Sequence, residues 1–269
     1  MCCAADAQLV KDVMCVMTTL TVIRLTQWLD LLESNALQRL SACNSRSFAR
    51  SRKISNYCDV SIVRILSHRG IWREVAEKNS IEALARSLDR GFGLETDVRD
   101  SGGGLVISHD LPIGGELAFD AILHMVQRRN LPLAVNIKSD GLAVLVKKAM
   151  KDFCIADWFA FDMSVPDMRG YLDEGLPVFA RVSEVESDPP WVEEVAGIWF
   201  DSFEGNNYEV ERIGGYLRDG KRVCIVSPEL HGKPYLAVWR DFVALSGETE
   251  LMLCTDHPEE ARRLFLEDG

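Results

Sequence analysis

The sequence lacks any cysteine pair spaced as Cys-x-x-Cys, although it contains eight cysteines in 269 residues. Cys2 and Cys3 are adjacent, while Cys154, Cys224 and Cys254 lie in or beside apolar runs. This spacing does not suit a disulfide scaffold. We therefore expect buried free thiols and a reducing, cytoplasmic location.

A basic stripe with interleaved aromatic residues is also missing. Lys and Arg number 30 against 41 Asp and Glu, which gives a net charge of −11 and argues against a general nucleic-acid binder. This acidity does not exclude a phosphate substrate, because a bound cation can invert the local electric field.

The chain has no apolar run long enough to cross a bilayer. Val13–Leu25 is too short, is interrupted by Arg24, and is not preceded by the basic region of a signal peptide. We predict no stable membrane insertion. Residues 1–55 are expected to form an N-terminal helical extension and linker, or a poorly ordered tail that follows a start codon assigned too early. Residues 56–269 are expected to form one domain.

Beyond residue 60, short β-rich apolar runs alternate with amphipathic helical stretches. The clearest helix covers residues 81–88, with Asn79 as the expected N-cap. Further helices are expected at Phe119–Gln127, Leu142–Lys151, Pro166–Asp173 and Pro258–Phe265. The strands are expected at Val63–His68, Gly93–Asp97, Leu133–Lys138, Trp158–Asp162, Pro177–Arg181, Gly197–Asp201, Arg222–Ser227 and Leu251–Thr255.

The run Leu105–His109 breaks this alternation, because it follows Asp97 after too few residues for a helical crossover. The intervening Asp100–Gly104 segment is typical of a turn, so we expect an antiparallel return. Eight strand–helix units in about 210 residues predict an α/β protein with a (β/α)8 TIM barrel. An open doubly wound sheet is the main alternative.

Polar residues follow the apolar part of every expected strand, where a barrel places its catalytic mouth. Glu95 and Asp97 are two residues apart, so both carboxylates lie on one face of their strand. His68 ends the first strand and His109 ends the antiparallel return. Two carboxylates beside two imidazoles can bind a divalent cation and transfer protons, which favours metal-assisted cleavage of a phosphate ester. A structural ion pair and packed histidines are the alternatives.

Other polar residues at the expected mouth are more ambiguous. Asp162, Arg181 and Asp201 each end a strand and either line the pocket or are solvated strand ends. Glu229 lies in the segment after the seventh strand, where it either meets a polar substrate group or belongs to a plain loop. Asn136 and Lys138 share one parity on the third parallel strand, a pattern that solvated strand ends do not explain.

Several separate motifs resemble the glycerophosphodiester phosphodiesterase family, part of the group related to phosphatidylinositol-specific phospholipase C. They span roughly residues 63–265 and occur in the family's order. The motifs are His68-Arg69-Gly70, Asn79-Ser80-Ile81-Glu82-Ala83, Glu95-Thr96-Asp97-Val98-Arg99, Val106-Ile107-Ser108-His109-Asp110 and Thr255-Asp256-His257-Pro258.

This resemblance implies a (β/α)8 barrel in which Glu95 and Asp97 hold Ca²⁺ or Mg²⁺. It implies that His68 and His109 act as general acid and base across the scissile P–O bond. Arg69 would contact the phosphate.

The third barrel strand departs from the family pattern. The family has Glu-x-Lys there, with the Glu as a metal ligand, whereas this chain has Asn136-Ile137-Lys138. Asn136 can still offer a carbonyl oxygen but adds no charge, so we expect weaker cation binding unless Asp162 or Asp201 joins the ligands. Lys138 keeps its expected phosphate contact; a simple ion pair with Asp140 is the alternative.

The leading hypothesis is therefore a metal-dependent phosphodiesterase acting on a small-molecule diester. No apolar loop insertion is evident near the mouth, so a soluble glycerophosphodiester or phosphorylated saccharide is favoured over a bilayer lipid. A metal-dependent sugar isomerase or aldolase on the same barrel is one alternative. The other is a non-catalytic barrel that binds a phosphorylated glycan or head group.

Overall fold

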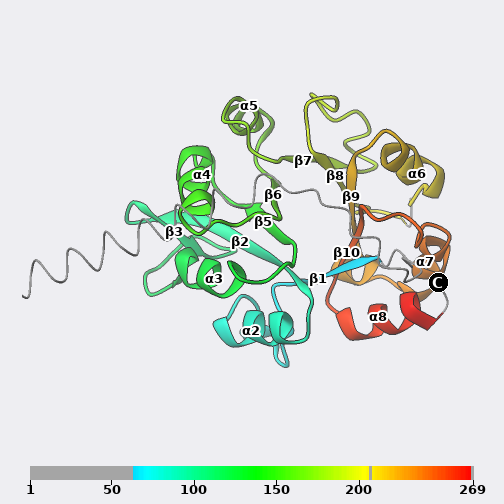
Figure 1. Cartoon of the computed structure of the whole chain (residues 1–269), viewed down its shortest axis with the longest axis horizontal. Helices are drawn as coiled ribbons and strands as arrows, with labels where there is room; N and C mark the ends of the chain where they lie inside the picture. The colour runs from blue at the N-terminus through cyan, green and yellow to red at the C-terminus, as the bar shows by residue number, and fades with distance from the viewer. Residues whose placement is uncertain (1–62, 206–207, 268–269) are drawn as a thin grey trace, which may run out of the picture. The chain divides into compact units, whose positions relative to one another are not determined.

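The structure is a computed structural model that describes residues 63–205 and 208–267. The predicted extension at residues 1–55 lies outside this part of the chain. Among the described residues, eight parallel strands form the centre of the fold (Figure 1). They are β1 (Arg64–His68), β2 (Gly93–Ser101), β5 (Leu133–Ile137), β6 (Trp158–Phe161), β7 (Phe179–Val182), β8 (Gly197–Phe200), β9 (Arg222–Val226) and β10 (Leu251–Thr255).

These strands close into a barrel. Parallel ladders join neighbours in the order β6, β5, β2, β1, β10, β9, β8 and β7. The last seam, between β6 and β7, is closed by one parallel bridge from Ala160 to Val178. Because β10 pairs with β1 and this bridge joins the remaining ends, the open doubly wound sheet is excluded and the predicted (β/α)8 barrel is confirmed.

The antiparallel return is also confirmed. β3 (Gly104–Ile107) pairs antiparallel with β2, and β4 (Leu117–Ala118) pairs antiparallel with β3. β2 is longer than predicted because its carboxyl end continues into this hairpin. The backbone N–H of Ser108 donates to the carbonyl of Asp97 at 3.1 Å, so the return ends at the level of the mouth.

Helices lie around the outside of the strands (Figure 1). They are α2 (Ile81–Asp89), α3 (Phe119–Val126), α4 (Ala143–Asp152), α5 (Val165–Asp173), α6 (Val210–Arg218), α7 (Leu236–Val243) and α8 (Pro258–Glu267), with short 3-10 helices η1 (Val75–Glu77) and η2 (Pro228–His231). Ser80, not Asn79, caps α2, because its side chain accepts a hydrogen bond from the N–H of Ala83. In the described chain no helix is long and apolar enough to span a membrane.

One expected strand–helix unit has no α-helix, since residues 183–196 join β7 to β8 without one. Pro189 and Pro190 explain this, because proline lacks a backbone N–H and disfavours helical conformation in the residue before it. Loops here replace the fifth helix of the barrel.

Two apolar cores hold the barrel together. The larger core lies between the strands and the helices. The smaller core fills the barrel interior, where the ring of Phe161 stacks on Trp199 at 3.8 Å and that of Phe159 stacks on Phe179 at 3.6 Å. Cys224 and Cys254 belong to this interior core and form no disulfide, as predicted. Burial raises the pKa of both thiols, so neither is a reactive thiolate.

Candidate active site at the barrel mouth

Along each strand, the side chains that face the barrel interior are continued at the mouth by residues of the same parity. Successive side chains alternate between the two faces of a strand, so His68 lies on the same face as the interior residue Leu66. By the same parity, Asn136 and Lys138 follow Ala134. Arg181 and Asp201 likewise share the parity of interior residues on their own strands, whereas Asp162 does not. The predicted clustering of strand-end polar groups therefore rests on the same alternation that builds the core.

His68 is held by a carboxylate to which the sequence motifs assigned no role. Nδ1 of His68 donates a hydrogen bond to Oδ1 of Asp256 at 2.8 Å, and Nε2 lies 4.0 Å from Oε2 of Glu95. Burial raises the pKa of Asp256, but the hydrogen bond and charge of His68, together with Lys78, outweigh burial and hold that pKa below its ordinary value. Asp256 thus fixes the proton of His68 on Nδ1 and leaves Nε2 turned toward the carboxylate pair.

Glu95, Asp97 and Asn136 form a buried group of oxygens on two adjacent strands. Asp97 is the register partner of Asn136 in the ladder between β2 and β5. Nδ2 of Asn136 donates to Oε1 of Glu95 at 3.2 Å. The exposed fractions are 1% for Glu95, 0% for Asp97 and 7% for Asn136. This is an unusual concentration of polar groups in a dry environment.

Three oxygens in this group have no hydrogen-bond partner, namely Oε2 of Glu95, Oδ1 of Asp97 and Oδ1 of Asn136. Burial, and next the charge of Asp97, raise the pKa of Glu95. Unpaired buried oxygens are costly, and hard oxygen ligands are what Mg²⁺ and Ca²⁺ require. The residues present therefore fit a divalent cation. No cluster of three or more His, Cys, Asp or Glu side chains in the described chain has the arrangement of a metal site. The amide oxygen of Asn136 is the third oxygen beside the two carboxylates.

Asp97 is also fixed from the side of the β1–α2 loop. Nδ2 of Asn79 donates to Oδ2 of Asp97 at 2.8 Å, and Oγ1 of Thr96 donates to Oδ1 of Asn79 at 2.8 Å. Nε of Arg69 lies 2.7 Å from Oδ2 of Asp97, an ion pair whose angle does not make a hydrogen bond. The family-like Asn79 is thus a positioning residue for the carboxylate pair, a role that only the fold reveals.

The backbone conformation after β1 requires a glycine at position 70. Arg69 has φ of +56° and Gly70 has φ of +87°, and the N–H of Arg69 donates to the carbonyl of Glu95 at 3.0 Å. A Cβ on Gly70 would lie 2.6 Å from the carbonyl carbon of Ala83 in α2. Only glycine permits this close turn, which brings the guanidinium of Arg69 beside Asp97.

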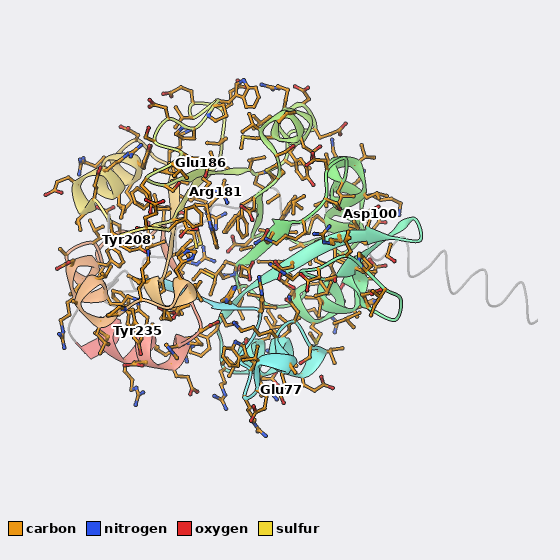
Figure 2. The ribbon with its side chains drawn as sticks, turned by 180° about the vertical axis from the view of Figure 1, so that it is seen from behind. Glu77, Asp100, Arg181, Glu186, Tyr208 and Tyr235 are labelled. Carbon is orange, nitrogen blue, oxygen red and sulfur yellow. The ribbon has the colours of Figure 1, made fainter. Side chains whose placement is uncertain are left out.

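A row of alternating charges runs from the oxygen group across the mouth. Nζ of Lys138 lies 3.6 Å from Oδ1 of Asp97 and donates to Oδ2 of Asp162 at 3.0 Å. NH1 of Arg181 donates to Oδ1 of Asp162 at 2.6 Å, and two further nitrogens of this guanidinium donate to Glu186. Figure 2 shows Arg181 and Glu186 near each other. Burial lowers the pKa of Arg181, but these carboxylates outweigh burial and raise it.

Asp162, predicted as a metal ligand, therefore has both oxygens in ion pairs with Lys138 and Arg181. It follows the interior residue Phe161, so strand alternation alone would point it outward. A φ of +70° instead breaks the strand geometry at Asp162. This position links the charges of neighbouring strands, while its predicted metal ligation stays untested.

His109 is exposed, in contrast to the buried carboxylates Glu95 and Asp97. Its side chain is 50% exposed, and Nδ1 donates to Oδ1 of Asp110 at 2.9 Å. The backbone carbonyl of His109 accepts a hydrogen bond from Nε of Arg99 at 3.1 Å. The loop is thus held at the mouth through its backbone, and the ring is accessible to a ligand.

Glu229 ties the ends of two strands together. One oxygen accepts from Oγ of Ser227, and the other accepts from Oγ1 of Thr255 and from the N–H of Asp256 at 3.1 Å. Both oxygens are therefore engaged by the chain itself. This geometry makes Glu229 a support for Asp256, and its predicted substrate contact stays a prediction.

A second imidazole–carboxylate pair, made of a half-buried histidine and a buried aspartate, lies at the carboxyl ends of β8 and β9. Oδ1 of Asp201 accepts a hydrogen bond from Nε2 of His231 at 2.7 Å. Burial raises the pKa of Asp201 despite the opposing charge and hydrogen bond of His231. The predicted metal contact of Asp201 has no support in this pairing.

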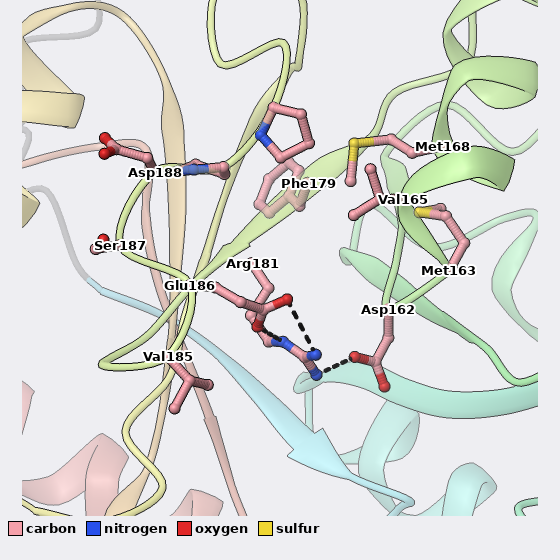
Figure 3. A pocket seen from close by; sticks show the side chains of 12 residues that line it. Asp162, Met163, Val165, Met168, Phe179, Arg181, Val185, Glu186, Ser187 and Asp188 are labelled. Carbon is pink, nitrogen blue, oxygen red and sulfur yellow. Dashed lines mark hydrogen bonds and ion pairs between the residues drawn. The ribbon is translucent and has the colours of Figure 1, made fainter.

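A cavity of about 370 Å³ opens beside Asp162 and Arg181 (Figure 3). Its other walls come from the start of α5 and from the β7–β8 segment. Three members of the charged row, Asp162, Arg181 and Glu186, thus line a cavity that the sequence did not indicate.

Comparisons with known proteins agree with this architecture. No protein-family model and no curated protein matches the sequence. Among solved structures, a glycerophosphodiester phosphodiesterase from Agrobacterium tumefaciens has 18% identity and a TM-score of 0.56, covering 77% of this chain and 99% of that chain. One from Parabacteroides distasonis has 14% identity and a TM-score of 0.59, covering 78% and 88%. A putative one from Silicibacter pomeroyi has 15% identity and a TM-score of 0.57, covering 77% and 94%.

These similarities bear on the fold. The chain has the (β/α)8 barrel of the glycerophosphodiester phosphodiesterases, as its motifs predicted. The roles of individual residues rest on the geometry described above.

Proposed function

We propose that this protein is a divalent-cation-dependent phosphodiesterase acting on a glycerophosphodiester-like or phosphorylated-saccharide diester. The observation that carries the proposal is the group of three buried oxygens without a hydrogen-bond partner, beside an imidazole whose other nitrogen is fixed by Asp256. Glu95, Asp97 and Asn136 would hold Mg²⁺ or Ca²⁺, and the cation would supply positive charge to the phosphoryl oxygens.

The chain's own residues have separate tasks in this proposal. Nε2 of His68, free of a proton in the tautomer that Asp256 favours, accepts the proton of the attacking water or substrate hydroxyl. His109, exposed at the mouth, donates a proton to the leaving alkoxide. Lys138 and Arg69 bind the phosphoryl oxygens, and Arg181 faces the remainder of the substrate.

Asp162 has a positioning role in this proposal, and its predicted metal ligation stays untested. Because both of its oxygens are paired with cationic side chains, we propose that it orients Lys138 and Arg181. Glu229 similarly supports Asp256. The buried free thiols Cys224 and Cys254 fit the predicted cytoplasmic compartment.

The test is a screen of phosphodiesters with the full-length protein in the presence of Mg²⁺, Ca²⁺ or Mn²⁺, with EDTA as the control. We expect hydrolysis that requires a cation and is lost on Asp97→Asn substitution. Cation binding by calorimetry without any diester cleavage would favour the sugar isomerase or aldolase alternative. Absence of cation binding at millimolar concentration would favour a non-catalytic barrel.

A further inference from the structure

The cavity beside the charged row has a lining that is about half apolar, with the apolar side chains gathered on two of its walls. Met163, Val165 and Met168 line it from the β6–α5 side, and Val185, Pro189 and Pro190 line it from the β7–β8 segment (Figure 3). Its volume of about 370 Å³ is within the range of small-molecule sites. It lies at the seam where β6 and β7 are joined by a single bridge and where no helix follows β7.

The charges in this cavity do not favour the binding of a second anionic group of the substrate. The guanidinium of Arg181 is neutralised by Asp162 on one side and by Glu186 on the other. Asp188 adds a further, exposed carboxylate at the lining. A second phosphate or carboxylate would therefore meet excess negative charge, whereas an uncharged apolar group would displace water from the methionine and proline walls.

Several exposed apolar side chains also lie around the mouth. In the described chain, the large apolar side chains that are exposed lie in loops that follow β1, β3 and β7, or in the first turns of α2, α4, α5 and α7. The loops that follow the strands and the first turns of the helices both lie at the mouth end of a (β/α)8 barrel. Ile113, in the loop after His109, is 97% exposed, while Val165 and Val185 are exposed and also line the cavity.

Single residues from separate segments make up this face, so no apolar insertion marks it in the sequence. The expectation of a soluble glycerophosphodiester or phosphorylated saccharide, in preference to a bilayer lipid, rested on the absence of such an insertion. The tertiary structure instead places apolar side chains at the mouth and at the cavity.

We propose that the cavity is a subsite for an apolar alcohol arm of the substrate, so that the enzyme prefers diesters in which one ester group is an alkyl chain. The inference rests on the proposed phosphodiesterase function. Hydrolysis would add water across one P–O bond and give a phosphomonoester and an alcohol, with the phosphate at Lys138 and the alkyl arm against Met163, Val165 and Met168.

The experiment uses glycerol phosphodiesters of straight-chain primary alcohols from methanol to octanol, with the full-length protein and Mg²⁺ or Ca²⁺. We expect kcat/KM to rise about fourfold for each buried methylene until the cavity is filled. In Val165→Asp, which places a charge at the cavity, the ratio of kcat/KM for the octyl and methyl esters should fall toward one.

Val144→Asp is the matched control, because Val144 is another exposed valine in the first turn of a neighbouring helix, α4, and does not line the cavity. An acidic residue is favourable in a first helical turn, so both variants should fold, and thermal unfolding checks this. Val144→Asp should keep the chain-length dependence of the wild type.

A binding experiment distinguishes this inference from the proposed function. Stabilisation against thermal unfolding is measured with straight-chain alkyl phosphates. If no diester is cleaved but stabilisation grows with chain length and is lost in Val165→Asp, the function is wrong and the subsite stands. If diesters are cleaved at rates that do not depend on chain length, the subsite is overturned and the function stands. Binding and cleavage that are both independent of chain length also overturn the subsite.

Discussion

Asp256 accepts a hydrogen bond from His68 at 2.8 Å, although 188 positions separate the two residues in the chain. β1 and β10 are neighbours in the closed barrel, so the residues at their carboxyl ends meet. This contact determines which nitrogen of His68 faces Glu95, and it defines the first prediction.

Asp256→Asn should lower kcat about 100-fold with little change in KM, because the amide no longer favours the proton on Nδ1 of His68. The measurement is steady-state kinetics on the best diester from the screen, together with the pH profile of kcat. A purely structural role would lower stability without altering the pH profile, and that result would refute the proton-positioning role.

His109→Ala should reduce turnover by two orders of magnitude or more while leaving the unfolding temperature nearly unchanged, because the ring is half exposed and its ring contact is with neighbouring Asp110. His124→Ala, at an exposed position on α3, is the control and should retain activity. Equal rates for both variants on every active diester would remove His109 from the mechanism.

Asn136→Asp should strengthen cation binding about tenfold, since it adds a third charge to the oxygen group. The same change should lower stability without cations, because three carboxylates would then share a buried space. Calorimetric titration with Mg²⁺ and Ca²⁺ and urea denaturation in EDTA measure the two effects. Weaker cation binding in Asn136→Asp would place the ion elsewhere.

Stability in the absence of cations should depend on the protonation of Glu95. Burial and the charge of Asp97 raise the pKa of Glu95 above its ordinary value of 4.5, so the folded protein retains a proton that the unfolded chain releases. Stability should therefore fall as the pH rises from about 4.5 through the folded pKa. Glu95→Gln should remove this slope and also the stabilisation by Mg²⁺ or Ca²⁺.

Urea denaturation in EDTA at several pH values tests this dependence, with Glu82→Gln, an exposed carboxylate on α2, as the control. The control should keep the wild-type slope. A slope that survives Glu95→Gln would show that another group is responsible.

Gly70→Ala should destabilise the fold by about 3 kcal/mol or more, because the new Cβ would meet the backbone of α2 and the residue has positive φ. Gly103 offers a matched control, because it has φ of +83° and no atom lies within 4 Å of the position that an added Cβ would take. Gly103→Ala should cost only about 1 kcal/mol, from the left-handed conformation itself. If urea denaturation gives the same loss of unfolding free energy for both variants, the β1–α2 turn shifts to accommodate the methyl group.

The strands and the antiparallel return could be predicted because their signal is local. Alternation of side chains along a strand depends only on neighbouring residues, and Val98 pairs with Ile107 because the chain between them is too short for a helix. The eight expected strand–helix units included one after β7, where Pro189 and Pro190 disfavour a helix. Its absence has a local cause after all.

The features of the site also divide into those that local sequence predicts and those that require the tertiary structure. The sequence by itself determined that Glu95, Asp97 and Asn136 share one face of neighbouring strands, since parity and strand order suffice for that. Only the tertiary structure decided that Asp256 meets His68, since barrel closure brings the last strand beside the first. Likewise, a positive φ reverses the direction expected from strand alternation and joins Asp162 to Lys138 and Arg181. The cavity beside these residues forms from segments that no local pattern connects.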